Sequence, residues 1–382
     1  MSNVLLVDTN FSSAPIYQYL IDSGHNVTVV GANPSDALAK SAVDYVNLDY
    51  SDIQKIIELV TERNIEYLIP GCNDRSYMVC AEINHDGRFP GIDCINSATI
   101  INNKEKFRSF AALNNLPIPQ ILNEQEIGTR WPVIVKPVDS FSGRGVTVIQ
   151  EASSKKLLAA IDIARQKSHS ANYIVEDFVE GQLFSHSAFI KDKVIIFDIV
   201  VEEYGTANPF AVDTSRVVHN FPQSILEKIR KDIVFIVNKL NLKDGLLHTQ
   251  FIKNGSKYWL IEVTRRCPGD LYSQLIELTT GTNYVENYIR PFIKLPFNLT
   301  THKKKKWVIR HTLSQSFDYT LGSFSFTIPL LIIKWIPISV TGDRVYASPY
   351  GRIGIIFTEM NSEKELLETL IIILKRKLYA IN

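Results

Sequence analysis

The sequence predicts a mixed α/β protein that begins with a doubly wound N-terminal domain and ends in a strand-rich C-terminal segment. The first observation is a pair of short apolar runs, Asn3–Val7 and Asn26–Val30, separated by a helix-like segment and Gly24. This β-α-β alternation continues to about Cys94 and is typical of a parallel sheet covered by helices. The second observation is a change of pattern at Trp131, after which strands predominate.

Within the first domain, we expect a helix that starts at Ser51 and a buried strand at Ile65–Pro70. Ser51 is of a type that caps helices, and the apolar residues after it recur at helical spacing. The first turn of the domain reads DTNFSSAP and lacks the G-x-G-x-x-G fingerprint. A nicotinamide dinucleotide site is therefore not expected here.

Further along, a helix at Asn103–Asn115 is expected to stop at the prolines of NNLPIP. Residues 224–242 carry apolar side chains on one face and predict an amphipathic helix. The runs LLHTQF and YWLIEV predict an antiparallel hairpin around Asn254-Gly255. An amphipathic helix over 362–378 is expected to close the chain.

Composition narrows the function classes. The chain has 382 residues, and 41 basic against 40 acidic residues give a net charge of +1. Such balance does not favour a nucleic-acid or membrane-surface protein. The longest apolar run, Thr327–Val340, is too short to span a bilayer and contains Lys334. Four cysteines without C-x-x-C spacing and an N-terminus without signal-peptide character predict a cytoplasmic protein with reduced thiols.

The stretch VIVKPVDSFSGRG places Lys136 at the end of an apolar strand and two glycines, Gly143 and Gly145, in the loop that follows. A buried lysine is costly unless an anion meets it. Glycines let backbone N–H groups approach a phosphate, and a lysine at the base of the loop can hold the same phosphate. Taken alone, the stretch is better explained as an ordinary turn, because Gly-x-Gly loops are common, and it is not a Walker A loop.

Two later features point to the same chemistry. The strand YIVEDFVEG has a polar, glycine-terminated end whose backbone could contact a purine. The hairpin carries Gln250 and Glu262 on neighbouring strands, followed by Thr264, and oxygen ligands of this kind suit Mg²⁺. Arg265 and Arg266 come next, and arginine suits a phosphoryl group that must be neutralised.

Taken in order, four segments resemble the ATP-grasp superfamily: NKEKFRSFAALNNLPIP, VIVKPVDSFSGRGV, VEDFVEG and IEVTRRCPGD. The resemblance covers about 103–290. It implies a doubly wound pre-ATP-grasp domain at 1–100 and an ATP-grasp domain at 101–295, with a lid at about 116–182. A strand-rich C-terminal subdomain with a closing helix would occupy 296–382.

The resemblance also implies residue roles. The ATP phosphates would be held by two lysines and the glycine loop, namely Lys104, Lys136, Ser142, Gly143 and Gly145. The adenine hinge would comprise Glu176, Phe178 and Val179. The ligands of Mg²⁺ (or Mn²⁺) would be Gln250, Glu262 and Thr264. Arg266, together with Lys136, would stabilise the transferring phosphoryl group.

The chain departs from the family pattern at several positions. Thr264 stands where a metal-binding asparagine is usual. Gln250 replaces the first metal carboxylate, as in proteins that resemble the large subunit of carbamoyl-phosphate synthetase. Leu183 stands where an acidic residue usually holds the ribose, and Glu180 or Ser185 would substitute for it. These departures bear on metal and ribose binding, not on the fold.

The hairpin offers a geometric prediction. A two-residue turn at Asn254-Gly255 would pair Gln250 with Trp259 and place Gln250 and Glu262 on opposite faces of the sheet. To share a metal ion, the two side chains must face the same way. We therefore predict a three-residue loop or a β-bulge in this hairpin.

The reaction that the resemblance implies is ligation. ATP phosphorylates a carboxylate to an acyl phosphate, and an amine then displaces phosphate, so the partners are a small-molecule carboxylate and amine. Candidate substrate contacts are Asp213, Arg216, Gly269 and Asp270, together with residues 73–75. For Arg216, a surface salt bridge is the alternative interpretation. A homodimer is compatible with the resemblance.

Two other interpretations stay open. Gln250 suggests an enzyme that phosphorylates in the manner of carbamoyl-phosphate synthetase, although the chain holds one ATP-grasp unit and not two. Leu183 and Thr264 suggest a degenerate ATP-binding module without catalysis. The presence of Lys136, Glu262 and Arg266 favours the ligase.

Overall fold

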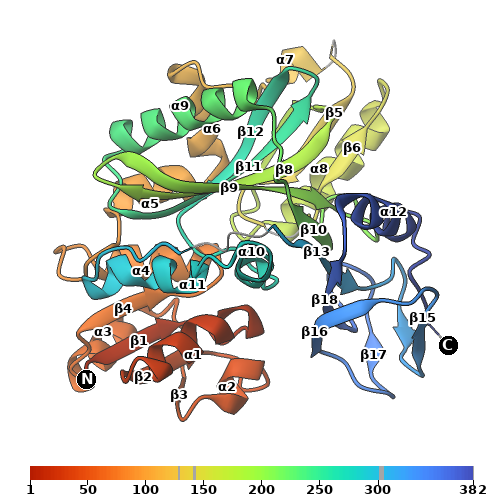
Figure 1. Ribbon diagram of the computed structural model, residues 1–382. Coiled ribbons are helices and arrows are strands. Elements are labelled where there is room, and N and C mark those ends of the chain that lie inside the picture. The colour runs from red at the N-terminus through yellow and green to blue at the C-terminus, as the bar shows by residue number, and fades with distance from the viewer. Residues whose placement is uncertain (128–129, 141–142, 301–304, 382) are drawn as a thin grey trace.

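The computed structural model describes residues 1–127, 130–140, 143–300 and 305–381. Figure 1 shows the first sheet in red and orange at the lower left, the yellow and green sheets above it, and the blue C-terminal strands at the lower right. The predicted mixed α/β class with a strand-rich C-terminal region is confirmed.

The first sheet is parallel and has the strand order β3-β2-β1-β4. Its strands are β1 Asn3–Val7, β2 Asn26–Gly31, β3 Asp44–Asn47 and β4 Tyr67–Pro70. The helices around it are η1 Phe11–Ser13, α1 Ala14–Asp22, α2 Ala37–Ser41, α3 Ile53–Glu62 and α4 Asp74–Ile83. The order of the strands reverses between β1 and β4, and ligands of doubly wound sheets bind beyond the strand ends at such a point.

The cap of α3 corrects one prediction. The N-cap residue is Asp52, whose side chain accepts a hydrogen bond from the backbone N–H of Lys55. Ser51 lies one residue too early to do this, so the predicted cap at Ser51 is wrong. Both residue types can cap a helix, and the sequence does not distinguish neighbouring candidates.

A small antiparallel sheet of order β6-β5-β7 follows. Its elements are β5 Val133–Pro137, β6 Thr147–Ile149 and β7 Tyr173–Asp177, with α8 Ser154–Lys167 packed on it. Three helices lead up to it: α5 Ile95–Asn102, α6 Lys104–Leu113 and α7 Glu124–Ile127. Lys136 lies in the central strand of this sheet, which explains why apolar residues surround it in the sequence.

The largest sheet is antiparallel and has the order β12-β11-β8-β9-β10-β13-β18-β16. Its first strands are β8 Gln182–Lys191, β9 Val194–Tyr204, β10 Thr214–Val217, β11 Gly245–Asn254 and β12 Lys257–Thr264. The others are β13 Trp307–Leu313, β16 Leu331–Pro337 and β18 Gly354–Met360. Helix α9, Gln223–Lys239, covers one face, where Ile229 and Ile233 join a cluster with Phe184 and Phe251.

The opposite face of this sheet meets α10, Tyr272–Thr280, and α11, Tyr284–Ile289. The hydroxyl groups of Ser185 on β8 and Tyr272 lie 2.8 Å apart. Because Phe184 and Ser185 are consecutive in a strand, they point to opposite faces. The α10 face is therefore the polar face of the sheet, and it carries the candidate site.

The remaining elements lie mostly in the blue region of Figure 1. They are η2 Arg290–Ile293, β14 Tyr319–Thr320, β15 Phe324–Phe326, β17 Arg344–Val345, α12 Glu363–Leu374 and β19 Tyr379–Ile381. A cluster that includes Leu366 and Leu370 of α12 packs this helix against Ile309 and Ile356 of the large sheet. The C-terminal strands are thereby attached to the end of that sheet.

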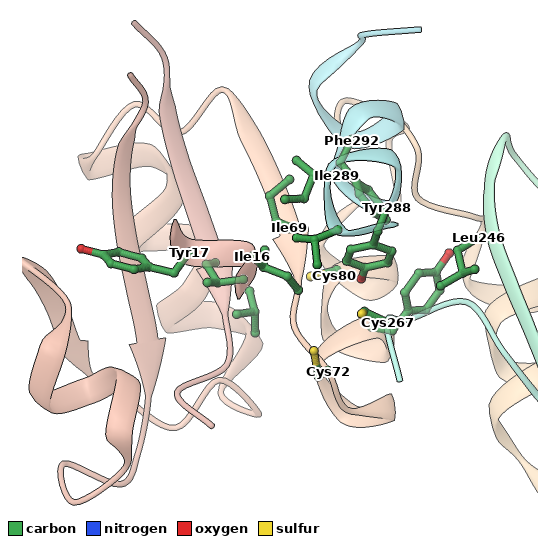
Figure 2. Close-up of a cluster of buried hydrophobic side chains, with 14 of the residues drawn as sticks. Ile16, Tyr17, Ile69, Cys72, Cys80, Leu246, Cys267, Tyr288, Ile289 and Phe292 are labelled. Carbon is green, nitrogen blue, oxygen red and sulfur yellow. The ribbon is translucent and has the colours of Figure 1, made fainter. Parts of the chain in front are cut away.

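One continuous core joins the first sheet to the large one. Figure 2 shows Ile16 and Ile69 of the first domain close to Tyr288 and Ile289 of α11, with Cys72 and Cys267 beside them. The four cysteines are free thiols. This core holds the loop after β4 against the loop after β12, and the candidate site lies where these loops meet.

Candidate active site

The first part of the site is a buried triad around Glu176. The Lys136 ammonium lies 2.6 Å from one Glu176 oxygen, and Nε of Arg108 lies 2.6 Å from the other. The Glu176 and Arg108 side chains are 0% and 1% exposed, and that of Lys136 is 13% exposed. Because two cations share one carboxylate, the triad carries an excess positive charge where the phosphates are expected.

The pKa shifts of Lys136 and Glu176 agree with an excess of positive charge in the triad. Burial lowers the pKa of Lys136, and the attraction of Glu176 only partly offsets it. Burial alone would raise the pKa of Glu176, but Lys136 and Arg108 outweigh it and hold the pKa below its ordinary value. An arriving anion would therefore meet a cationic site that is already ordered.

Lys104 lies between the glycine loop and the hairpin. Its ammonium donates to the backbone carbonyl of Ser140 at 2.9 Å and lies 3.8 Å from Glu262. Gly143 has a φ of +68°, and a Cβ there would lie 2.4 Å from the Phe210 carbonyl oxygen. Only glycine fits this close approach. Ser142 lies outside the described residues.

The predicted hinge lies at the end of β7. The backbone N–H of Phe178 donates to the Pro132 carbonyl at 3.1 Å, and the carbonyl of Glu180 accepts from the Asn254 amide at 3.1 Å. Val179, between them, is half-buried. The Glu176 side chain points to Lys136, so its role in the structure is charge pairing within the triad. A contact of this segment with adenine stays a prediction.

The hairpin contains the predicted bulge. Its turn is Gly255-Ser256, with Asn254 paired to Lys257, and the register shifts so that Gln250 lies directly opposite Glu262. Directly opposed residues of an antiparallel pair point to the same face. The geometric prediction is therefore confirmed: a bulge aligns the two side chains.

The three predicted metal ligands differ in their availability. Gln250 donates to a Glu203 oxygen at 2.8 Å, which places a further carboxylate beside the pair. The Thr264 hydroxyl donates to Asp74 at 2.9 Å. Within the described ranges, no group of three or more His, Cys, Asp and Glu side chains has the arrangement of a metal site. A metal ion here would depend on Glu262 and Gln250 together with ligands from a nucleotide.

Arg266 pairs with a carboxylate of the first domain. Its Nε and Nη2 donate to the two oxygens of Asp74 at 2.9 and 3.2 Å. Burial would lower the pKa of Arg266, but Asp74 outweighs it and raises the pKa. Burial would likewise raise the pKa of Asp74, which Arg266 lowers instead. The arginine is thus fixed at the junction of two sheets that lie far apart in sequence.

The candidate substrate residues separate into two groups. Arg216 pairs with Glu202 at 2.5 Å on the α9 face, opposite to Glu203 and Gln250, so we do not include it in the site. Asp213 accepts hydrogen bonds from Thr206 and from the backbone of Ala207, which orders that loop. Both positions have structural partners that account for them.

Gly269 and Asp270, by contrast, reach the site. The backbone N–H of Asp270 donates to the Ser12 hydroxyl at 3.0 Å, and its carboxylate pairs with Arg352. A Cβ on Gly269 would meet Cys72 only at 3.7 Å. Of residues 73–75, Asn73 caps α4 and Arg75 pairs with Asp49, whereas Asp74 holds Arg266.

Four residues of the site were not singled out from the sequence, namely Arg108, Glu203, Arg310 and Arg352, whereas Asp74 was among the candidate substrate contacts. Arg108 lies one helical turn after Lys104, so its position on α6 was a usable signal. The others come from strands and loops whose proximity depends on the fold, and the sequence carries no local sign of it.

A cavity among the described residues lies away from these charged groups. It has a volume of about 280 Å³ and opens between β9 and α9, beside Phe197, Phe221 and Arg230. None of the candidate site residues named above lines this cavity. The candidate site is therefore identified by its convergent charged groups and not by this cavity.

Comparison with known proteins agrees with this geometry. Residues 129–274 match the family described as "ATP-grasp domain", and this range contains Lys136, Glu176, Glu262 and Arg266. The chain contains an ATP-grasp domain. The match does not extend to Arg310 and Arg352, which follow the ATP-grasp domain in sequence.

Two curated relatives illustrate the similarity. The chain is 24% identical over 264 residues to a D-alanine–D-alanine ligase of Fusobacterium nucleatum, an alignment that covers 65% of this chain and 86% of the relative. It is 21% identical to a phosphoribosylamine–glycine ligase of Pyrococcus furiosus over 53% of this chain and 49% of the relative. The chain thus spans only about half the length of the second relative.

Solved structures share the whole fold around the ATP-grasp domain. The L-amino acid ligase from Bacillus licheniformis superposes with a TM-score of 0.79 at 16% identity, covering 100% of this chain and 98% of that one. The phosphoribosylglycinamide synthetase from Anaerococcus prevotii gives 0.76 at 17% identity, over 100% and 99% of the two chains. At such identities, the likeness establishes the fold alone.

Proposed function

We propose that this protein is an ATP-dependent ligase that activates a carboxylate as an acyl phosphate and couples it to an amine, giving ADP and phosphate. The observation that supports this most is the alignment of Gln250 with Glu262, with the Lys104 ammonium 3.8 Å from Glu262 and Arg266 near enough for Glu262 to raise its pKa. Cations beside two oxygen-bearing side chains suit a transferring phosphoryl group.

The chemistry requires positioning and charge neutralisation more than proton transfer. In the first step, a carboxylate oxygen attacks the γ-phosphorus and ADP leaves. In the second step, the amine attacks the acyl carbon, phosphate leaves with the former carboxylate oxygen, and the amine loses a proton to solvent. Lys104 and Lys136 would hold the ATP phosphates, and Arg266 would stabilise the phosphoryl group in both steps.

The donor set fits Mg²⁺, which commonly takes one or two protein oxygens and completes its shell with phosphates and water. Glu262 and Gln250 would hold it, with Glu203 behind Gln250. When bound, the ion would neutralise charge on the phosphates. We do not include Thr264, because its hydroxyl is engaged by Asp74. A manganese ion would meet the same ligands.

The names of the similar proteins support the substrate class. They include ligases named for alanine, for glycine and for amino acids. Other similar structures are described as complexes with ADP or with MgADP. We accordingly propose small-molecule carboxylate and amine substrates, without nucleic acid. No helix among the described residues is long and apolar enough to cross a membrane.

Location and assembly belong to the same proposal. We propose a cytoplasmic protein, a location consistent with four free thiols. A homodimer is proposed because one similar structure is described as a dimer. Light scattering on the purified protein tests the assembly directly, and a monomer at all concentrations would contradict it.

The test of the function is ADP formation with pairs of acids and amines. Wild-type protein with MgATP is expected to form ADP only when both a suitable acid and a suitable amine are present. Glu262→Ala is expected to abolish this turnover while leaving the protein folded. Turnover that persists in Glu262→Ala would contradict the site, and tight nucleotide binding without ADP from any pair would favour a non-catalytic module.

A further inference from the structure

The cavity between β9 and α9 contains an unpaired strand edge. Because β10 pairs with β9 only over residues 201–204, the first part of β9, Val194–Val200, has no strand on that side among the described residues. The Val218 backbone N–H donates to the Val200 carbonyl at 2.9 Å, so this carbonyl points to the open side. Backbone groups alternate in direction along a strand, and those of Asp198 therefore point the same way. The last residues of this edge line the cavity.

Helices on both faces of the sheet supply the walls of the cavity. Leu226 and Arg230 of α9 line it from one face, and Thr279 and Thr280 of α10 line it from the other. Phe221 adds an aromatic surface. An extended chain beside β9 would point its successive side chains to alternate walls. The cavity therefore has the form of a groove for one extended, peptide-like segment.

One wall of the cavity carries a buried hydroxyl without a partner. Thr279 is 1% exposed, and its Oγ1 has no hydrogen-bond partner among the described residues. The Thr280 hydroxyl, by contrast, donates to the Ile276 carbonyl at 2.7 Å. A buried polar group that stays unpaired costs free energy, and a ligand that bonds to it recovers this cost. Thr279 is therefore available to a polar group of a ligand.

Cations predominate among the charged residues that line the cavity. The Arg230 guanidinium is 39% exposed and donates to both oxygens of Asp198 at 2.6 and 2.8 Å. His186 lies 2.8 Å from the same carboxylate, which is therefore already engaged. Lys305 is exposed and forms no salt bridge with any described residue; its ammonium lies 3.5 Å from the Asn220 side-chain oxygen. One cation of the cavity is thus available to an anionic group.

The size of the cavity limits its occupant. Its volume of about 280 Å³ is near the lower end of the range for small-molecule sites, which begins at about 300 Å³. An unpaired sheet edge can also pair with a strand of another protein. A whole partner strand would not fit within this volume, whereas a ligand of about dipeptide size would.

We propose that this cavity is a second ligand site, which binds a short peptide with a free carboxylate. The peptide amide pairs with the backbone of Asp198, and its apolar side chain packs on Phe221 and Leu226. Thr279 accepts or donates one hydrogen bond, and Lys305 meets the carboxylate. The inference goes beyond the proposed ligase function and does not depend on it, because no residue of the candidate active site lines this cavity.

The experiment measures peptide binding to the full chain in the absence of ATP and Mg²⁺. Dipeptides of alanine, valine, leucine and phenylalanine are screened by thermal unfolding. Each dipeptide that raises the Tm is compared with its C-terminal amide and with its analogue methylated at the peptide nitrogen. We expect at least one dipeptide to raise the Tm and both of its analogues to have no effect. The amide lacks the negative charge, and the methylated analogue lacks the donor for the β9 edge.

Two substitutions locate the site, with the affinity for the dipeptide measured by calorimetry. Lys305→Met is expected to lower the affinity at least about tenfold, because it removes a charged hydrogen-bond donor. Thr279→Val is expected to lower it by about three- to tenfold, because it removes a neutral hydrogen-bonding group. Lys228→Met is the matched control, since Lys228 is an exposed lysine of α9 that does not line the cavity. It should bind the dipeptide as the wild type does.

Neither substitution is expected to lower the Tm of the ligand-free protein, because Lys305 is exposed and Thr279→Val removes an unpaired buried hydroxyl. The inference is overturned if no dipeptide raises the Tm, if either analogue binds as well as its dipeptide, or if Lys305→Met and Lys228→Met bind alike. It is also overturned if Arg266→Met abolishes binding and Lys305→Met does not, since the dipeptide would then occupy the candidate active site.

Discussion

The two ends of the site are built differently. At the nucleotide end, Lys104, Arg108, Lys136 and Glu176 come from one continuous stretch of sequence and form a closed, buried triad with a neighbouring lysine. At the substrate end, the charges come from separate segments, namely Asp74, Arg266, Asp270, Arg310 and Arg352. The first end therefore depends mainly on one region of the sequence, whereas the second depends on the tertiary fold.

This difference indicates which part of the site can change in sequence without loss of the fold. In the triad, two cations depend on one buried carboxylate, so the loss of Glu176 would leave both of them unpaired. A cluster assembled from loops and strand ends can change one arginine or aspartate without loss of the fold. We therefore expect the chemistry of phosphate handling to reside in the first end and the choice of acid in the second.

The largest expected effect is on stability at the nucleotide end. Glu176→Gln leaves Lys136 and Arg108 without their shared carboxylate, and breaking such a buried pair costs about 3–5 kcal/mol. Urea unfolding at neutral pH measures this. Glu180→Gln, at an exposed position four residues away, should change stability by no more than about 0.5 kcal/mol. Equal effects of the two variants would show that the triad is not a folding element.

The next effect separates catalysis from binding. Arg266→Met is expected to lower kcat by about 100- to 1,000-fold, because it would remove the charge that we propose stabilises the transferring phosphoryl group. The affinity for MgATP should change little, since the triad stays intact. Steady-state kinetics and calorimetry measure the two quantities. A variant that loses nucleotide affinity but keeps its kcat would place Arg266 at the nucleotide end instead.

A third prediction concerns a loss of MgATP affinity. Lys136→Met should weaken the binding of MgATP by at least about 30-fold, since it removes the buried cation that we propose holds the phosphates. Calorimetric titration measures this affinity. Lys156→Met is the control, because Lys156 is an exposed lysine of α8, the helix that packs on the same small sheet. Unchanged affinity would mean that Lys136 serves only to neutralise Glu176.

The smallest effect concerns pH. Burial raises the pKa of Glu203 above its ordinary value, so the folded protein holds this proton more tightly than the unfolded chain does. The contribution of Glu203 to the free energy of unfolding is fully present at pH values below the ordinary pKa of glutamate. It is lost as the pH rises through the raised pKa. Glu203→Gln should therefore gain stability relative to the wild type across that window. If the free energy of unfolding of Glu203→Gln and that of the wild type change with pH in the same way, this expectation is wrong.

Much of this molecule could be predicted from its sequence, for physical reasons. The β-α-β alternation from Asn3 and the apolar run before Lys136 indicate elements whose periodicity is local. The bulge opposite Gln250 followed from register, since two ligands must share a face. The roles of the individual site residues remain predictions.

Other features could not be predicted. Asp74 and Arg266 are paired although 192 positions separate them in the sequence, so no local pattern indicates the pair. Arg216 seemed suited to a substrate, but strand register sends it to the α9 face. Arg310 reads as one residue of an apolar strand, and only the packed sheet reveals that its Nε lacks a partner among the described residues.

The most direct test of the ligase proposal follows an oxygen atom. The acid that supports turnover is labelled with ¹⁸O in its carboxylate, and the released phosphate is analysed by mass spectrometry. Activation as an acyl phosphate predicts one ¹⁸O in each phosphate formed. Unlabelled phosphate, formed at the same rate, would mean that water attacks ATP directly and would contradict the account.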